Sequence, residues 1–183
     1  MPESLAHGAH GLQNGVPDAI ILSLFNNAQR LHQRNQAQFH SSGTSSEASF
    51  LTRMTTSGTL SDRLSALTLL IQSSPANNTQ SLEVLKGMAE RGRGKGGREE
   101  ALKALRCIVD WWVGGGCPGR KLRYWRDQFV VAGIQGKAEE DVSKAIGEEK
   151  MVEWYFEDWL KKYFFSVLQV LEVSLFQIPP LYV

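Results

Sequence analysis

The chain of 183 residues contains few of the side chains that bind metals or form disulfides. It has two cysteines, Cys107 and Cys117, and its four histidines all precede residue 41. Two cysteines cannot build the disulfide framework of a small secreted domain, so we expect both to be free thiols in a reducing compartment. Neither the histidines nor the cysteines have the paired spacing of zinc ligands, and the sequence therefore predicts no metal site.

Long apolar runs are also missing. The most apolar stretch covers residues 163–178, and polar side chains interrupt it repeatedly. It is shorter than the roughly 20 residues that a membrane-spanning helix needs. No basic segment followed by an apolar one opens the chain, so a secretory signal is not expected either. The sequence thus predicts neither a secreted nor a membrane-spanning protein.

The chain has no strong net charge, because 20 Lys and Arg residues balance 19 Asp and Glu residues to give +1. The charges are nevertheless segregated along the sequence. Residues 86–126 carry eleven basic and four acidic side chains, whereas residues 127–160 carry three basic and nine acidic ones. This asymmetry favours a surface that meets phosphate or an acidic partner, unless the two blocks simply neutralise each other in the fold.

No catalytic pattern stands out. Cys117 lies in a glycine-rich turn, and no histidine is near it in the sequence to activate the thiol. Residues 92–97 match the pattern G-x-G-x-x-G, but a helical pattern precedes them, whereas a dinucleotide site requires a strand there. We therefore expect no enzymatic activity, no cofactor and no small-molecule substrate.

Apolar residues recur at helical spacing along most of the chain, and no stretch shows the period-two alternation of a strand. Residues 1–17 lack apolar periodicity and are expected to form a disordered tail, and residues 18–46 to form an amphipathic helix and a Ser-rich linker. Thr59-Leu60-Ser61-Asp62 has the pattern of a capping box, and Pro75 ends the helix that follows. We predict an all-α fold of successive helical hairpins, with further helices near residues 50–54, 82–89, 101–112 and 148–177.

Two basic tracts are candidate RNA-binding segments. Residues 91–98 are similar to the Arg-Gly segments that follow a nucleic-acid backbone, although a glycine-rich loop with solvating charges is also an ordinary linker. Residues 120–126 interleave cations with rings, which suits contact with phosphates and unpaired bases. Within them we favour burial of Leu122 and Trp125, with the cations outside. The predicted RNA-binding side chains are Arg91, Arg93, Lys95, Arg98, Arg120, Lys121, Arg123 and Arg126.

The last predicted helix is unusually aromatic between residues 154 and 165. One side of a helix cannot hide that much ring surface, so either several neighbours surround the helix or a partner covers the remainder. We expect open apolar surface near its end. The predicted partner-binding side chains are Trp154, Tyr155, Trp159, Leu168, Leu171 and Leu175.

Four blocks of the sequence resemble, in the same order, the CCAAT-binding-factor family of nucleolar complex proteins. The blocks are SGTLSDRLSALTLLIQSSP at 57–75, REEALKAL at 98–105, RKLRY at 120–124 and WYFEDWLKK at 154–162. Together they extend the resemblance over residues from about 48 to 171. It implies a HEAT/armadillo-like α-solenoid of stacked helical hairpins, with residues 47–183 as the N-terminal part of the helical-repeat domain, truncated at the C-terminus.

The same resemblance implies a non-catalytic scaffold in the nucleus and nucleolus, acting in assembly of the large (60S) ribosomal subunit precursor. Its implied partners are a second nucleolar complex protein, other pre-ribosomal assembly factors and pre-ribosomal RNA. Two departures from the family are visible. The tract at residues 91–97 is richer in glycine than the lysine-rich loop expected there, and the chain stops at Val183, where the family continues. We therefore expect an N-terminal fragment or truncated product.

Two alternatives remain open. The family's historical name suggests a DNA-binding transcriptional regulator, although the sequence contains no helix-turn-helix signature, zinc finger or basic zipper. The other alternative is a pure protein-interaction helical module, in which the aromatic helix would be the working surface.

Overall fold

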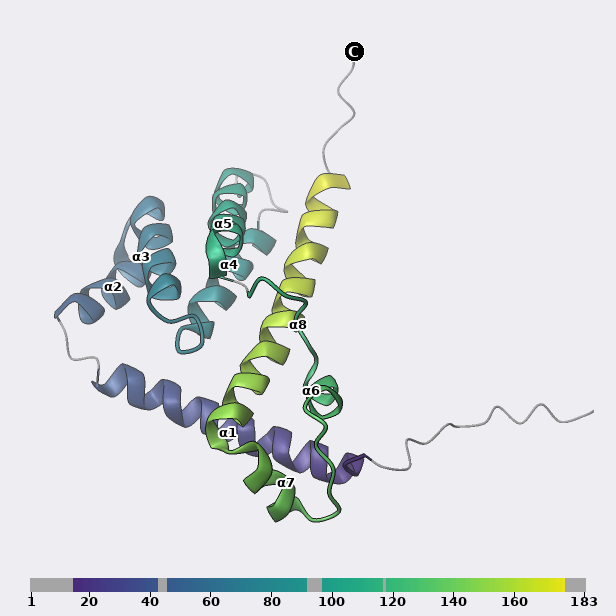
Figure 1. Ribbon diagram of the computed structural model, residues 1–183. Helices are drawn as coiled ribbons and strands as arrows, with labels where there is room; N and C mark the ends of the chain where they lie inside the picture. Colours follow the sequence, from purple (N-terminus) through teal and green to yellow (C-terminus); the bar gives the residue numbers. More distant parts are fainter. Residues whose placement is uncertain (1–14, 43–45, 92–96, 117, 177–183) are drawn as a thin grey trace, which may run out of the picture.

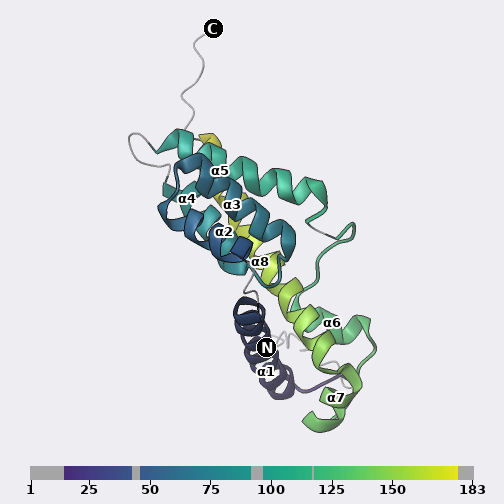
Figure 2. The same ribbon diagram turned by 90° about the vertical axis from the view of Figure 1, so that its left-hand side faces the viewer.

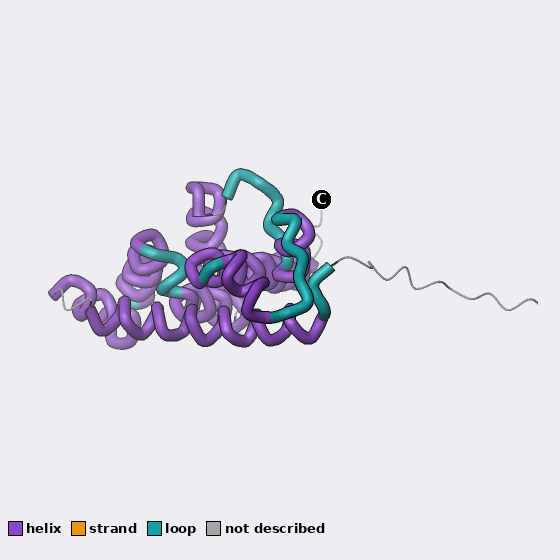
Figure 3. Tube along the Cα trace, turned by 60° about the horizontal axis from the view of Figure 1, so that its bottom comes forward, coloured by secondary structure: helices purple, strands orange, loops and turns teal. Residues whose placement is uncertain are grey.

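The computed structural model describes residues 15–42, 46–91, 97–116 and 118–176, and only the backbone of residues 46–48 and 174–176. Within those ranges all regular structure is helical, and no strand occurs (Figure 3). The all-α prediction is therefore confirmed. The α-helices are α1 (Asp18–Ser42), α2 (Ser46–Ser57), α3 (Leu60–Ser73), α4 (Thr79–Arg91), α5 (Arg98–Trp111), α6 (Trp125–Val131), α7 (Glu139–Ile146) and α8 (Glu148–Phe176).

The start and the end of α3 follow from the local sequence. The backbone N–H of Asp62 donates to Oγ1 of Thr59 at 3.3 Å, and the backbone N–H of Thr59 donates to Oδ2 of Asp62 at 3.1 Å. This reciprocal pair is the predicted capping box, and it satisfies two amides that the first turn leaves without helical partners. The helix ends at Ser73, two residues before Pro75. Both predictions are confirmed.

The long helix α8 joins two groups of helices (Figure 1). Its first half lies against α1, α6 and α7, and its second half lies against α4. The second view shows α2, α3, α4 and α5 gathered along the second half of α8 (Figure 2). Within that group α3 packs on α2, α4 and α5, and α4 packs most extensively on α5.

The core has two parts, one in each group. The first lies between α3, α4, α5 and the second half of α8 and includes Leu67, Leu85 and Met88, each at most 2% exposed. Tyr163 of α8 belongs to it, and its hydroxyl donates to the backbone oxygen of Leu82 at 2.8 Å. Burial raises the pKa of Tyr163 well above its usual value, and the nearby carboxylates Glu83 and Glu90 act in the same direction. The second half of α8 is therefore fixed to the helical hairpin of α3 and α4.

The second part of the core lies between α1, α6, α7 and the first half of α8. Leu24 of α1, Val142 of α7 and Met151 of α8 are at most 1% exposed there. Val16 is 8% exposed and belongs to the same cluster, although it falls in the segment predicted to be a disordered tail. Residues 1–14 of that segment lie outside the described residues. The segment around α1 thus shares a core with α8.

The short helix α7 and the long helix α8 follow each other almost directly. Gly147 separates them with φ of +81°, a conformation that glycine adopts without the steric cost of a side chain. The backbone can therefore turn sharply before α8 begins at Glu148. None of the helices described here is both long and apolar enough to span a bilayer.

Candidate nucleic-acid interface

The basic and aromatic segment at residues 120–126, which we call the basic strip, crosses α8 as extended chain and enters α6 at Trp125. Leu122 is 8% exposed and Trp125 is 5% exposed. The indole nitrogen of Trp125 donates to the backbone oxygen of Ile21 at 3.0 Å, which ties the strip to α1. The predicted burial of these two side chains is confirmed, and it fixes the strip between α1 and α8.

A buried carboxylate of α8 anchors the strip. Glu157, with 7% of its side chain exposed, accepts two hydrogen bonds from the guanidinium of Arg120, at 2.5 and 2.8 Å. It also accepts from the backbone N–H of Arg123 and the side-chain amide of Gln128, both at 2.8 Å. Burial by itself would raise the pKa of Glu157, but these four bonds and the charge of Arg120 lower it to about 2. The carboxylate is therefore ionised at neutral pH and fully bonded.

The next residue, Asp158, makes a second anchor. One of its oxygens accepts from the backbone N–H of Trp125 at 2.9 Å, and the other accepts from Nζ of Lys162 at 2.6 Å. Only 4% of the Asp158 side chain is exposed. Two consecutive carboxylates of α8 thus hold the backbone of the strip at Arg123 and Trp125.

Sequence reasoning assigned no role to Glu157 and Asp158. The available signal was the position of an acidic pair inside an otherwise aromatic stretch, in a chain whose preceding block is strongly basic. The pairing itself joins residues 33 to 37 positions apart. Helical periodicity carries no information about such distant partners. The sequence therefore indicated a role for the rings of α8 but not for its two carboxylates.

The predicted cations of the strip fall into two kinds. Arg120 is bonded to Glu157, and Arg126 pairs with Asp18 at 2.6 Å while 64% of its side chain stays exposed. Lys121 is exposed and Arg123 is half-buried, and within the described chain neither side chain forms an ion pair. Arg120 is therefore chiefly a structural residue, whereas Lys121 and Arg123 present charge that the fold does not neutralise.

The other basic tract lies apart from the strip. Arg91 ends α4 and Arg98 begins α5, and both are exposed, whereas Arg93 and Lys95 lie outside the described residues. The 14 residues of α5 rise about 21 Å between Arg98 and the segment that leads to the strip. Figure 2 shows these two regions at opposite ends of α5. The structure therefore brings together the four cations of the strip but does not join Arg91 and Arg98 to them.

Two further cations, absent from the sequence-based set, lie beside the strip. The ammonium of Lys161 is 3.6 Å from the centroid of the Tyr124 ring, which is a close cation–π contact. Lys162, one residue along α8, has 58% of its side chain exposed. Two consecutive lysines of α8 thus extend the charged surface of the strip.

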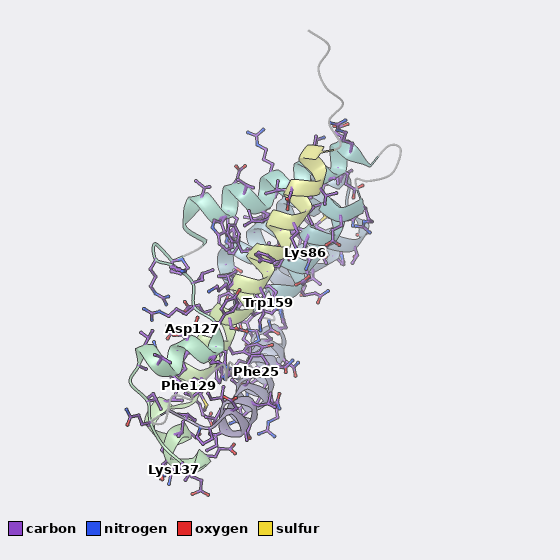
Figure 4. The ribbon with its side chains drawn as sticks, turned by 90° about the vertical axis from the view of Figure 1, so that its right-hand side faces the viewer. Phe25, Lys86, Asp127, Phe129, Lys137 and Trp159 are labelled. Atoms are coloured by element: carbon purple, nitrogen blue, oxygen red, sulfur yellow. The ribbon has the colours of Figure 1, made fainter. Side chains whose placement is uncertain are left out.

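The aromatic residues of α8 are used mainly inside the molecule. Trp154 is 5% exposed and packs on Trp125 and Phe129, with ring centroids 6.2 and 5.5 Å apart. Tyr155 contacts Phe25 and His32 of α1. In Figure 4 Phe25 and Phe129 lie on either side of the first half of α8. The rings on Trp154 come from α6 and those on Tyr155 come from α1, and sequence reasoning had placed neither helix against α8. Trp154 has almost no surface left for a partner.

The other predicted partner-binding residues differ in exposure. Trp159 is half-buried and stacks on Tyr163 at 5.2 Å between ring centroids. Leu171 is also half-buried, whereas Leu168 is 44% exposed and the adjacent Phe165 is 60% exposed. The side chain of Leu175 lies outside the described residues. The open apolar surface is therefore centred on Phe165 and Leu168, and its role in partner binding stays a prediction.

Comparison with known proteins identifies the relatives of this chain, although no protein-family model matches it. It is 35% identical to the ribosome biogenesis protein NOC1 of Chaetomium thermophilum over 169 residues, which is 87% of this chain and 16% of that protein. It is 30% identical to the human CCAAT/enhancer-binding protein zeta over 160 residues, 85% of this chain and 15% of that protein. The chain belongs to the CCAAT-binding-factor family.

The resemblance seen in the four sequence blocks is thereby confirmed. An uncharacterised protein of Schizosaccharomyces pombe is similar as well, with 35% identity over 126 residues, 69% of this chain and 13% of that protein. The chain spans about one seventh of the length of these family members. The aligned part nevertheless covers most of the described fold, including the two helix groups, since it reaches 87% of the chain in the Chaetomium protein.

Proposed function

We propose that this chain is a non-catalytic scaffold segment in ribosome biogenesis, acting in assembly of the 60S subunit precursor in the nucleolus. The observation that carries the proposal is its 35% identity to a protein named for ribosome biogenesis, over 87% of the chain. In this role it binds pre-ribosomal RNA and other assembly factors, including a second nucleolar complex protein. The relatives' names describe no catalysis, which agrees with a role in binding alone.

The proposal includes the arrangement of the helices. We propose that α3, α4 and α5 begin a HEAT/armadillo-like solenoid, in which successive hairpins stack. The support is that each of these helices packs on the next one in the chain and that α3 also reaches α5. In a solenoid each repeat buries its apolar face against its neighbours, so the exposed apolar residues Phe165 and Leu168 of α8 are a suitable surface for a further helical segment.

The proposed RNA contact is the basic strip together with Lys161 and Lys162. Two features support it. The strip is held to α8 by three hydrogen bonds to Glu157 and one to Asp158, so its backbone is fixed where the cations begin. Within the described residues the side chains of Lys121 and Arg123 form no ion pair with a carboxylate. A phosphate can therefore bind them without displacing an acidic side chain. A fixed, unneutralised cationic surface is what contact with a phosphate backbone requires.

The salt dependence of RNA binding tests this proposal. Each phosphate contact to single-stranded RNA contributes about 0.7 to the slope of log affinity against log salt concentration. The double substitution Lys121→Ala and Arg123→Ala should reduce that slope by up to about 1.4 on this scale. The matched control is Lys137→Ala with Lys144→Ala, which removes two exposed cations near α7. Equal slopes for the two double variants would rule out the strip as the RNA contact.

A pure protein-interaction module is the second candidate, and one observation favours it. Phe165 and Leu168 of α8 are large apolar side chains that are 60% and 44% exposed, on the helix that organises the whole fold. Surfaces of this kind mark sites of protein association when they form a continuous patch. Under this alternative the chain would bind assembly factors normally after loss of Lys121 and Arg123, and it would show no salt-dependent RNA affinity.

A further inference from the structure

A hollow of about 340 Å³ opens on the surface beside the basic strip. It lies where α1, the strip and α8 meet. Its apolar lining includes Leu22 and Phe25 from α1 and Tyr124 and Trp125 from the strip. Its charged lining consists of two cations, Arg126 and Lys162, and the two carboxylates that they contact, Asp18 and Asp158. The hollow therefore combines ring surface with cations drawn from separate parts of the chain.

Two apolar side chains of the lining remain open to solvent. Leu22 is 61% exposed and Tyr124 is 44% exposed, although both adjoin a well-packed core. The backbone of Tyr124 is held in place because its N–H donates to Asp127 at 3.3 Å, and the ammonium of Lys161 lies over one face of the ring and restrains it. An exposed ring held in place is suited to stacking, since little conformational freedom is lost when a flat partner binds to it.

Each cation at the rim contacts a carboxylate but keeps N–H groups that can still bind a phosphate. Arg126 is bonded to Asp18, and both side chains are more than half exposed, so the pair is weak. Lys162 is bonded to Asp158, whose other oxygen is already used by the backbone of Trp125. Because an ammonium has three donors, Lys162 can contact a phosphate without leaving Asp158. Arg126 likewise has several N–H groups besides the one that meets Asp18.

We propose that this hollow binds one unpaired base of single-stranded RNA, which stacks on Tyr124 while Arg126 and Lys162 contact its flanking phosphates. The inference rests on the proposed RNA-binding function and names the part of the RNA that the strip recognises. An aromatic platform flanked by cations is the usual arrangement for binding single strands, and stacking accepts any base because every base has a π-face. The site distinguishes unpaired RNA from duplex, whose bases are stacked on each other.

The direct test compares two ligands that carry the same phosphates. One is a short oligouridine, and the other is the same ribose-phosphate chain without bases. The 183-residue chain should bind the oligouridine more tightly, by about 5- to 150-fold, the range that one base–aromatic stack contributes. The substitution Tyr124→Leu keeps an apolar side chain but removes the ring, so it should abolish this preference. Tyr124→Phe should retain the preference. Phe165→Leu should retain it too, because this control removes an exposed ring on α8 that does not line the hollow.

A second measurement follows the base itself. The fluorescence of 2-aminopurine in a single-stranded oligoribonucleotide falls when the base stacks, so wild-type protein and the Tyr124→Phe variant should quench it. The Tyr124→Leu variant should bind the same oligomer with little quenching. Circular dichroism of each variant reports whether the helices have formed.

The outcomes separate this inference from the proposed function. If the two ligands bind equally well and with a salt slope that depends on Lys121 and Arg123, the strip is a phosphate contact and the base site is wrong. If wild-type protein shows no salt-dependent affinity for either ligand, the proposed RNA-binding function fails, and the inference fails with it. A base preference that survives Tyr124→Leu would also overturn the assignment to this hollow.

Discussion

The guanidinium of Arg120 and the carboxylate of Glu157 form a two-point ion pair across 37 positions of the sequence. Glu157 is buried in the middle of α8, whereas 44% of the Arg120 side chain is exposed. The pair therefore connects the surface of the basic strip to the interior of the longest helix. Removal of either partner should affect both the stability of the fold and the placement of the neighbouring cations.

Loss of Arg120 should destabilise the protein because it removes two of the four hydrogen bonds to a buried carboxylate. We expect Arg120→Ala to lower the free energy of unfolding by about 1–3 kcal/mol, the usual cost of leaving a buried acceptor without its donors. Urea denaturation measures the change. The matched control is Arg106→Ala, because Arg106 pairs with Asp110 on the surface and both side chains are at least 70% exposed. That control should cost less than about 0.5 kcal/mol, and equal losses in the two variants would contradict the structural role of Arg120.

Acid should weaken the fold through the same carboxylate. The folded-state pKa of Glu157 is lowered to about 2, from its ordinary value of 4.5. Between these values the unfolded chain binds a proton that the folded chain does not, so stability rises with pH in that window. The contribution of Glu157 should be fully present above pH 4.5 and be lost as the pH falls toward 2. Unfolding free energies measured from pH 6 to pH 2 should therefore fall less steeply in Glu157→Gln than in wild type, and parallel curves would contradict the assignment.

The buried face of α3 can be tested with two leucines on one helix. Leu67 is 2% exposed in the first part of the core, whereas Leu69 is 50% exposed. We expect Leu67→Ala to cost about 2–5 kcal/mol, because it leaves a cavity in a packed core. Leu69→Ala changes the same residue type on the same helix and should cost less than about 0.5 kcal/mol. Chemical denaturation of both variants gives the comparison, and similar costs would mean that α3 presents a different face to α4 and α5.

The apolar end of α8 should make the chain associate with apolar compounds. Phe165 and Leu168 are exposed one turn apart on this helix. Their replacement in Phe165→Glu with Leu168→Glu should reduce the binding of a hydrophobic dye and any self-association seen in sedimentation. Val130→Glu is the control, because Val130 is 70% exposed on α6, away from this surface. If the control lowers dye binding as much as the double variant, the surface at Phe165 and Leu168 is not the site.

Local sequence was sufficient for the parts of the fold that depend on neighbouring residues. The capping box at Thr59 and Asp62, the stop before Pro75 and the long helix from Glu148 all involve contacts within a few positions. The burial of Leu122 and Trp125 could also be predicted, because their three-residue spacing among cations indicates a buried face. Each of these predictions uses a periodicity or a turn signal that the sequence displays directly.

The candidate site could be predicted only in outline. The indole of Trp125 bonds to Ile21, 104 positions away, and the hollow beside Tyr124 exists because α1 docks there. Nothing in the helical pattern of α1 specifies which distant helix it packs on. The burial of Trp154 by rings of α6 and the contacts of Tyr155 with rings of α1 were therefore missed. The roles of Glu157 and Asp158 were missed for the same reason. The sequence showed which residues of the strip are cations. Only the packed structure showed which of them form ion pairs and which keep an unpaired charge.

The central claim is that the basic strip contacts pre-ribosomal RNA, and crosslinking in cells tests it most directly. Ultraviolet crosslinking of the protein, followed by sequencing of the attached RNA, should recover precursor RNA of the large ribosomal subunit. Recovery should fall in the double variant Lys121→Ala and Arg123→Ala but not in the control Lys137→Ala and Lys144→Ala. Recovery of promoter DNA, of no nucleic acid, or of the same precursor RNA from both double variants at wild-type yield would contradict the account.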